Sequence, residues 1–150
     1  QIEAYRSALK LPADEKRGRA VFDKLCAVCH LSPSGQPMNG PDLRSITDRT
    51  KDGLFSSILD PNQNVDASYV GYAVTLADGT ALYGRVLSET SNNLTLRLLD
   101  GTDRQLLRRD IKTLQGTGLS LMPEGLEAGM NHQDLADLIR FVQTFERDDK

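Results

Sequence analysis

Both cysteines of the chain lie in the stretch "LCAVCH", where Cys26, Cys29 and His30 form the pattern C-x-x-C-H. Two thiols at this spacing on a helix end can each add across one of the two vinyl groups on one edge of a porphyrin. The residue that follows is then placed to put an imidazole nitrogen on the haem iron. The pattern therefore predicts a covalently attached haem.

Three other interpretations of the motif are open. A thioredoxin-like dithiol also uses C-x-x-C, but it needs a βαβ context that this region lacks. A zinc site would need a fourth ligand, and the sequence offers only His132 and no second cysteine pair. The motif could also arise by chance, so it needs support from other residues.

A methionine is a candidate for the second axial ligand of such an iron. His with Met is an axial pair that raises the reduction potential of haem. Met122 lies in the loop "SLMPEGL", directly before Pro123, which stiffens the backbone there. Met130, Met38 and His132 are the alternatives, and the ordinary role of a methionine is to fill a core.

Length and composition indicate one globular domain, with or without a small inserted unit. The chain has 150 residues, of which 39% are hydrophobic and 26% are charged. Aromatic residues make up only 5%, and Trp is absent. A large apolar cofactor could supply the core volume that these residues would otherwise provide.

Charge and hydropathy exclude several classes of partner. The formal net charge is −3, and no basic patch with interleaved aromatic residues is present, so no nucleic-acid partner is expected. No apolar run is long enough to predict a direct membrane span. The first residues carry no signal peptide, and we expect a mature or excised piece of a longer precursor.

Helical periodicity and end signals predict a largely helical chain interrupted by loops. Asn131 and Asp134 resemble a capping box at the start of the last helix. The stretch 32–43 is rich in Gly, Pro, Ser and Asn and is expected to be a loop. The predicted helices span residues 2–10, 13–30, 52–61 and 131–149.

Residues 69–114 change to a period of two and are expected to form an antiparallel β segment. Asp-Gly pairs at 78–79 and 100–101 predict two hairpins, each with a two-residue turn, and "DIKTLQ" could add a fifth strand. The predicted fold class is mainly α with an inserted small antiparallel β-barrel-like unit, α+β overall.

Several stretches resemble the class I c-type cytochromes. "GRAVFDKLCAVCH" resembles the opening of that family, with Gly18 and Phe22 ahead of the haem motif. "NGPDL" resembles its Gly-Pro-x-Leu loop, and "DLADLIRFV" resembles its C-terminal helix. The resemblance implies a cytochrome c fold that carries one haem c with its iron.

The family resemblance also implies roles for individual residues. The carbonyl of Pro41 would orient His30, and Gly18 would let the first and last helices approach closely. Phe22 and Phe141 would pack around that contact. The predicted cofactor-binding residues are Cys26, Cys29, His30, Pro41 and Met122, with His30 and Met122 as the metal ligands.

The combination of the haem motif, "LDP", a hairpin-rich insert and "SLMPEGL" resembles a narrower group, the haem-binding domain of Planctomycetes and Verrucomicrobia. This domain usually ends large secreted dehydrogenase-like proteins. The resemblance implies that residues 1–12 are a linker and that 13–150 form a monohaem cytochrome domain interrupted by 69–114. It implies a periplasmic or otherwise extracytoplasmic location, and a redox partner protein or an upstream catalytic domain on the same polypeptide.

The expected function is single-electron transfer, and the domain by itself is not expected to be an enzyme. The alternative is a haem-based ligand sensor or peroxidase-like enzyme in which Met122 dissociates. The β segment resembles Sm-like barrels and could be a lid over the haem edge, a docking surface or an oligonucleotide binder. Its few basic residues argue against the last of these.

Overall fold

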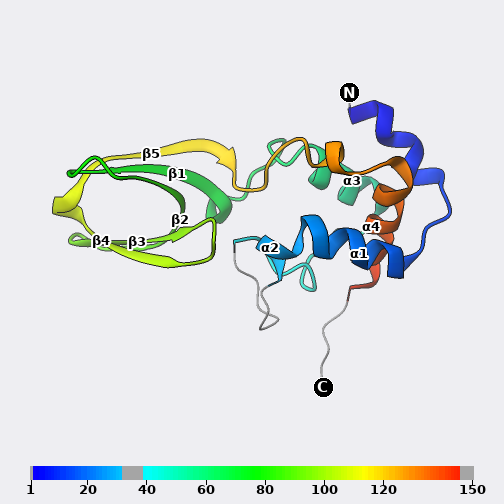
Figure 1. Cartoon of the computed structure of the whole chain (residues 1–150), viewed down its shortest axis with the longest axis horizontal. Coiled ribbons are helices and arrows are strands. Elements are labelled where there is room, and N and C mark those ends of the chain that lie inside the picture. Colours follow the sequence, from blue (N-terminus) through cyan, green and yellow to red (C-terminus); the bar gives the residue numbers. More distant parts are fainter. Residues whose placement is uncertain (1, 32–38, 146–150) are drawn as a thin grey trace, which may run out of the picture. The chain divides into compact units, whose positions relative to one another are not determined.

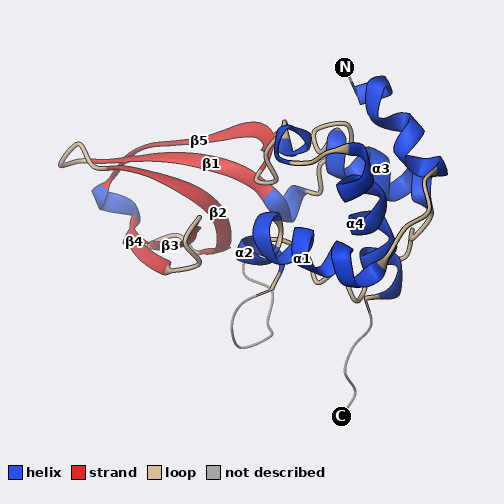
Figure 2. Ribbon diagram, turned by 45° about the vertical axis from the view of Figure 1, so that its right-hand side comes forward, coloured by secondary structure: helices blue, strands red, loops and turns tan. Residues whose placement is uncertain are grey.

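The computed structural model describes residues 2–31 and 39–145. The chain divides into two compact units, a helical unit (residues 1–63 and 123–150) and a β unit (residues 64–122), whose secondary structure is coloured in Figure 2. Helices together with an inserted antiparallel sheet confirm the predicted α+β class. The β unit contains the predicted segment 69–114, while the assignment of 1–12 as a linker and of 13–150 as one domain stays a prediction.

The haem-motif region of the helical unit forms two helices, whereas the sequence predicted a single helix over residues 13–30. The chain turns at Cys26, whose N–H donates to the Phe22 carbonyl at 2.8 Å. The Cys26 carbonyl then accepts from both Cys29 and His30 (3.1 and 3.0 Å), which tightens the next turn. The elements of this unit are η1 (Ile2–Lys10), α1 (Glu15–Leu25), α2 (Ala27–His30), α3 (Lys51–Leu59), η4 (Leu126–Gly129) and α4 (His132–Thr144).

Helices α1 and α4 cross at Gly18, as the family resemblance implied. A Cβ atom on Gly18 would lie 1.9 Å from the backbone oxygen of Asp137, so only glycine allows this approach. Phe22 and Phe141 pack beside the crossing with ring centroids 5.2 Å apart. Figure 1 shows the two helices, blue and orange-red, meeting in the helical unit.

A buried carboxylate, which the sequence analysis did not single out, also lies at this crossing. Asp137 is 1% exposed and accepts hydrogen bonds from the Asp14 amide (2.8 Å), Arg17 Nε (2.7 Å) and Gln133 Nε2 (2.9 Å). Burial opposes its ionisation, but these bonds and the Arg17 charge outweigh burial and hold the pKa of Asp137 below its ordinary value. The carboxylate therefore ties the start of α1 to α4.

The ends of the helices follow their capping residues. The predicted capping box of α4 is confirmed, because Asn131 and Asp134 each accept from the other's backbone N–H. Thr50 caps α3 by accepting from the Gly53 amide. The buried face of α3 carries Leu54, Phe55, Ile58 and Leu59.

The N-terminal segment forms a 3-10 helix, η1, that packs within the helical unit. Ala8 is its buried residue, whereas Ile2, Tyr5 and Leu9, predicted as the apolar face, are half-buried. The hydroxyl of Tyr5 donates to the Glu127 carbonyl at 3.2 Å. This hydrogen bond joins η1 to η4, and the rings of Tyr5 and His132, with centroids 4.8 Å apart, join η1 to α4.

The β unit is a five-stranded antiparallel sheet in the order β4-β3-β2-β1-β5. Within residues 64–122, all of which the structure describes, the sheet is not closed, so the barrel-like expectation is corrected to an open, curved sheet (Figure 1). The turn η3 leads from β4 at one edge to β5, which pairs only with β1 at the other edge. The elements are η2 (Ala67–Tyr69), β1 (Val70–Leu76), β2 (Ala81–Glu89), β3 (Asn93–Leu98), β4 (Asp103–Leu107), η3 (Arg108–Asp110) and β5 (Ile111–Ser120).

The core of the sheet is separate and apolar. Val74, Leu94, Leu96 and Leu106 are buried, and half-buried side chains from β1, β2, β3 and β5 surround them. The β unit thus has its own hydrophobic core.

Both predicted hairpins are present, but their predicted two-residue turns are wrong. In the first, the Leu76 amide donates to the Thr80 carbonyl, which leaves three residues in the loop. Only Gly79 has a positive φ (89°), because Asp78 stays at negative φ and its carboxylate accepts from the Thr80 amide. The second hairpin repeats this arrangement at Asp100 and Gly101.

We expect Gly18→Ala to lower the free energy of unfolding by about 1–3 kcal/mol, because the added methyl group must push α1 away from α4. The gain in helix propensity, about 1 kcal/mol, opposes this loss only in part. Denaturant unfolding of the haem-loaded protein measures the change, with Lys16→Ala on the exposed face of α1 as the control. A Gly18→Ala protein as stable as the wild type would contradict the close crossing.

We expect Asp137→Asn to cost about 1–3 kcal/mol at pH 7, because the bonds to Arg17 lose their charge. The pKa of Asp137 is lower in the folded than in the unfolded chain. Its contribution is therefore complete above about pH 4 and is lost as the pH falls through the folded pKa. Unfolding curves measured between pH 7 and pH 3 should converge for the two proteins, and a constant difference would refute this role. Asp23→Asn, at an exposed ion pair, is the control.

Candidate functional site

The C-x-x-C-H motif lies where α1 ends and α2 begins. Cys26 is the residue between the two helices, and Cys29 and His30 are the last two residues of α2. Both cysteines are free and half-buried. Cys26 and the short α2 thus present the two thiols and the imidazole from one turn of chain.

The imidazole of His30 is held by the loop that follows it. Its Nδ1 lies 2.9 Å from the carbonyl oxygen of Pro41. A carbonyl can only accept, so Nδ1 carries the proton and Nε2 keeps its lone pair. This is the tautomer that a metal-ligating histidine needs, and the contact is the one that the family resemblance implied for Pro41.

Gly40 leaves room for the imidazole ring. A Cβ atom at Gly40 would lie 2.5 Å from both Cε1 and Nδ1 of His30. The amides of Asn39 and Gly40 also donate to the Cys29 carbonyl, at 3.0 and 2.9 Å. The sequence analysis gave a role to Pro41 but none to Asn39 and Gly40, although both belong to the loop that it quoted.

The protonation states of the motif disfavour a redox dithiol. Burial, with a smaller contribution from Cys29, raises the pKa of Cys26 to about 12, and burial also raises the pKa of Cys29. Reactive dithiols need the opposite, a lowered thiol pKa. Burial lowers the pKa of His30, against the hydrogen bond to Pro41, so the ring is neutral at pH 7 and its lone pair is available.

The zinc interpretation gains no support from the part of the chain that the structure describes. No three His, Cys, Asp or Glu side chains among residues 2–31 and 39–145 gather as a metal site would require. His132, the one candidate for a fourth ligand, places its Nδ1 3.1 Å from the Ser7 hydroxyl and its ring 4.8 Å from that of Tyr5.

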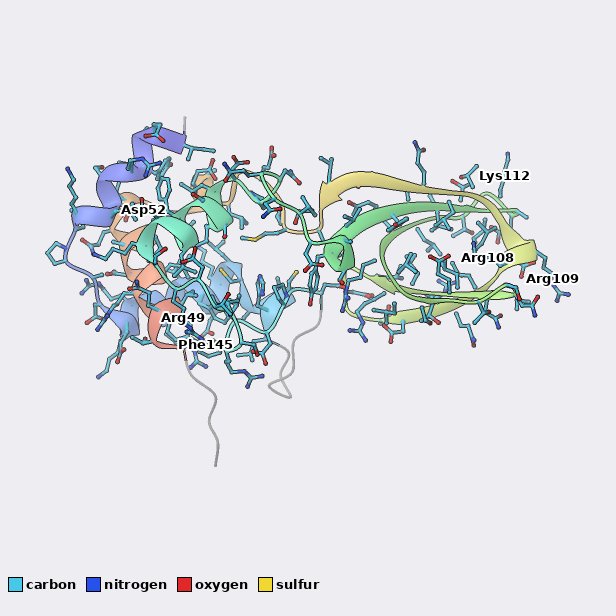
Figure 3. All side chains as sticks on the ribbon, turned by 180° about the vertical axis from the view of Figure 1, so that it is seen from behind. Arg49, Asp52, Arg108, Arg109, Lys112 and Phe145 are labelled. Atoms are coloured by element: carbon cyan, nitrogen blue, oxygen red, sulfur yellow. The ribbon has the colours of Figure 1, made fainter. Side chains whose placement is uncertain are left out.

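Arg49 anchors the loop that carries Pro41, and sequence reasoning missed it. Its guanidinium donates to the carbonyls of Leu43 (3.1 Å) and Arg44 (2.9 Å) within the loop, and to those of Val142 (2.9 Å) and Phe145 (3.2 Å) at the end of α4. Figure 3 labels Arg49 and Phe145, which lie together. A cation suits the C-terminal end of a helix, and here it ties the loop to α4.

The methionines occupy different surroundings. Met122 is half-buried at the end of the β unit, where its amide donates to the Ser120 hydroxyl at 3.1 Å. His30 belongs to the helical unit, so the role of Met122 as second axial ligand stays a prediction. Met130 is 7% exposed and fills the core, as is usual for methionine, and Met38 lies outside the described residues.

None of the helices among the described residues has the length and apolar character needed to cross a membrane.

We expect Gly40→Ala to displace the His30 ring from the Pro41 carbonyl, because the new methyl group would overlap the imidazole. The haem-loaded variant should show an altered absorption spectrum and lower thermal stability than the wild type. Gly129→Ala is the matched control, since its Cβ would meet only Leu25 at an ordinary 3.5 Å. Identical spectra and stabilities for wild type and Gly40→Ala would contradict the tight contact.

Comparison with known families gives one match. The model of the cytochrome c family matches residues 15–83, a range that includes α1, α2, the Pro41 loop, α3 and the first strand of the sheet. No curated protein matches the chain. A cytochrome c domain is typically an electron-transfer module, and such domains are generally extracytoplasmic or periplasmic. The match supports a c-type cytochrome, in which haem c and its iron are covalently bound.

Proposed function

We propose that the chain carries single electrons on one haem c. Cys26 and Cys29 would hold the haem through thioether bonds, and His30 and Met122 would ligate its iron. The proposal rests on the surroundings of the His30 ring. The ring lies close against Gly40, and its Nδ1 donates a hydrogen bond to the Pro41 carbonyl, which leaves the lone pair of Nε2 free to ligate iron.

The residues of the C-x-x-C-H motif fit a covalently attached haem. When bound, haem supplies a one-electron couple between its ferric and ferrous states. The protonated thiols of Cys26 and Cys29 are the groups that add across the vinyl double bonds. The Pro41 carbonyl keeps the proton on Nδ1 and raises the basicity of the ligating nitrogen. In this proposal the domain passes electrons and is not itself an enzyme.

The backbone around Met122 supports its assignment over that of Met130. The Leu121 amide donates to the Tyr69 carbonyl at 2.9 Å, and the Met122 amide donates to Ser120. Pro123 fixes the following φ angle. The thioether of Met122 thus comes from a restrained segment, whereas Met130 is committed to the core.

The wider setting that we propose follows from the sequence. The motif combination is typical of the Planctomycetes and Verrucomicrobia haem-binding domain, so we propose the electron-accepting domain of a larger secreted dehydrogenase-like protein. Its donor would be an upstream catalytic domain on the same polypeptide or a redox partner protein, in the periplasm or another extracytoplasmic space. The separate core of the β unit suits a lid or a docking module.

We expect Met122→Ala to lower the reduction potential and to remove the weak near-infrared band of the oxidised protein, because both depend on a thioether on the iron. Met130→Leu, which keeps core volume, and His132→Ala should leave both properties unchanged. Redox titration and absorption spectroscopy measure them. An unchanged band in Met122→Ala would show that another residue ligates the iron.

The same spectra separate an electron carrier from a ligand sensor or peroxidase-like enzyme. The reduced wild-type protein should not take up carbon monoxide, whereas Met122→Ala should bind it. Ready binding by the wild type would instead favour a dissociable methionine and the sensor or peroxidase-like function.

A further inference from the structure

A hydrogen bond joins the stretch of chain that enters the β unit to the stretch that returns from it. Asn62 lies on the entering stretch, and its Nδ2 donates to a carboxylate oxygen of Glu124, on the returning stretch, at 2.7 Å. A carboxylate only accepts, so the amide nitrogen of Asn62 is the atom that faces it. The charge of the acceptor makes this bond stronger than one between two neutral groups.

The two ends of this bond differ in how firmly the protein holds them. Asn62 follows α3 directly after the buried Pro61, and the Gln63 amide donates to the Asp60 carbonyl at 3.1 Å. Glu124 instead lies in an exposed turn of the returning stretch. The bond therefore attaches an exposed piece of chain to the well-packed end of α3.

Met122 lies between this bond and a second link of the same two stretches. Within the β unit, the Leu121 amide donates to the Tyr69 carbonyl at 2.9 Å. The chain between the two links forms a closed ring, in which Met122 and Pro123 are the only residues of the returning stretch. Pro123 has a fixed φ angle, so the ring restricts the conformations open to Met122.

We propose that the Asn62–Glu124 bond keeps the thioether of Met122 on the haem iron, which makes Glu124 a positioning residue for that ligand. The proposal rests on the proposed function, in which Met122 ligates the iron. A methionine that leaves the iron gains few conformations while the ring is closed. When the bond is broken, the returning stretch is free as far as η4, and the dissociated state gains entropy. The bond thus lowers the fraction of molecules whose iron is open to another ligand.

Binding of imidazole to the ferric haem-loaded protein measures this fraction. Imidazole takes the place of the thioether, so its apparent Kd varies inversely with the fraction of molecules in which Met122 has dissociated. Glu124→Ala should lower this Kd by about three- to tenfold, the range expected for the loss of one hydrogen bond. Glu124→Gln keeps an acceptor for Asn62 and should leave the Kd close to that of the wild type.

Further variants separate the bond from other effects of the substitutions. Asn62→Ala should match Glu124→Ala, and the double variant should match each single one, because all three lack the same bond. Glu3→Ala removes an exposed carboxylate that pairs with Arg6, and it should leave the Kd unchanged. In Met122→Ala no thioether competes with imidazole, so the addition of Glu124→Ala should have no effect there.

A wild-type Kd in Glu124→Ala would overturn the inference, as would a Kd in Glu124→Gln as low as that in Glu124→Ala. A similar fall on the Met122→Ala background would also overturn it. The near-infrared band distinguishes these failures from failure of the proposed function. If Met122→Ala keeps the band, another residue ligates the iron and both proposals are rejected. If Met122→Ala loses the band while Glu124→Ala binds imidazole like the wild type, only the role of Glu124 is rejected.

Discussion

The hydrogen bond between His30 and the Pro41 carbonyl is the interaction on which the site depends. It sets the tautomer of the imidazole, and it can form only because Gly40 has no side chain to occupy the space of the ring. The same loop receives support at both ends. Backbone amides at its start hold the Cys29 carbonyl, and Arg49 at its end binds carbonyls of the loop and of α4. The position of the His30 ring nitrogen therefore depends on contacts that the loop makes with α2, Arg49 and the end of α4.

The helical unit is stabilised by contacts that join its distant ends. Gly18 allows α1 to approach α4, and the Asp137 carboxylate links α4 to the first turn of α1. Because α1 leads directly to Cys26, these contacts also fix where the haem motif begins. The chain between α3 and η4 leaves this unit and forms a sheet with its own apolar core, so the insertion is a separate compact module.

Local chemistry determined which features the sequence predicted correctly. The contact between His30 and Pro41, the Asn131 capping box and the need for Gly18 depend on neighbouring residues or on a recognised pattern. Asp137 and Arg49 were missed because their partners lie far away in the sequence, and nothing in a helical stripe indicates what a charged residue on it will meet. The hairpin turns were wrong in length because the Asp78 carboxylate binds the Thr80 amide and stays out of the left-handed region. The open edges of the sheet depend on pairing between strands that hairpin signals do not encode.

Mass spectrometry of the intact chain, purified from cells that attach haem to exported proteins, tests the central claim most directly. The account predicts that the chain gains the mass of one haem, that this mass survives denaturation, and that it maps to the peptide with Cys26 and Cys29. An unmodified chain, or a haem released on denaturation, would contradict covalent attachment at this motif.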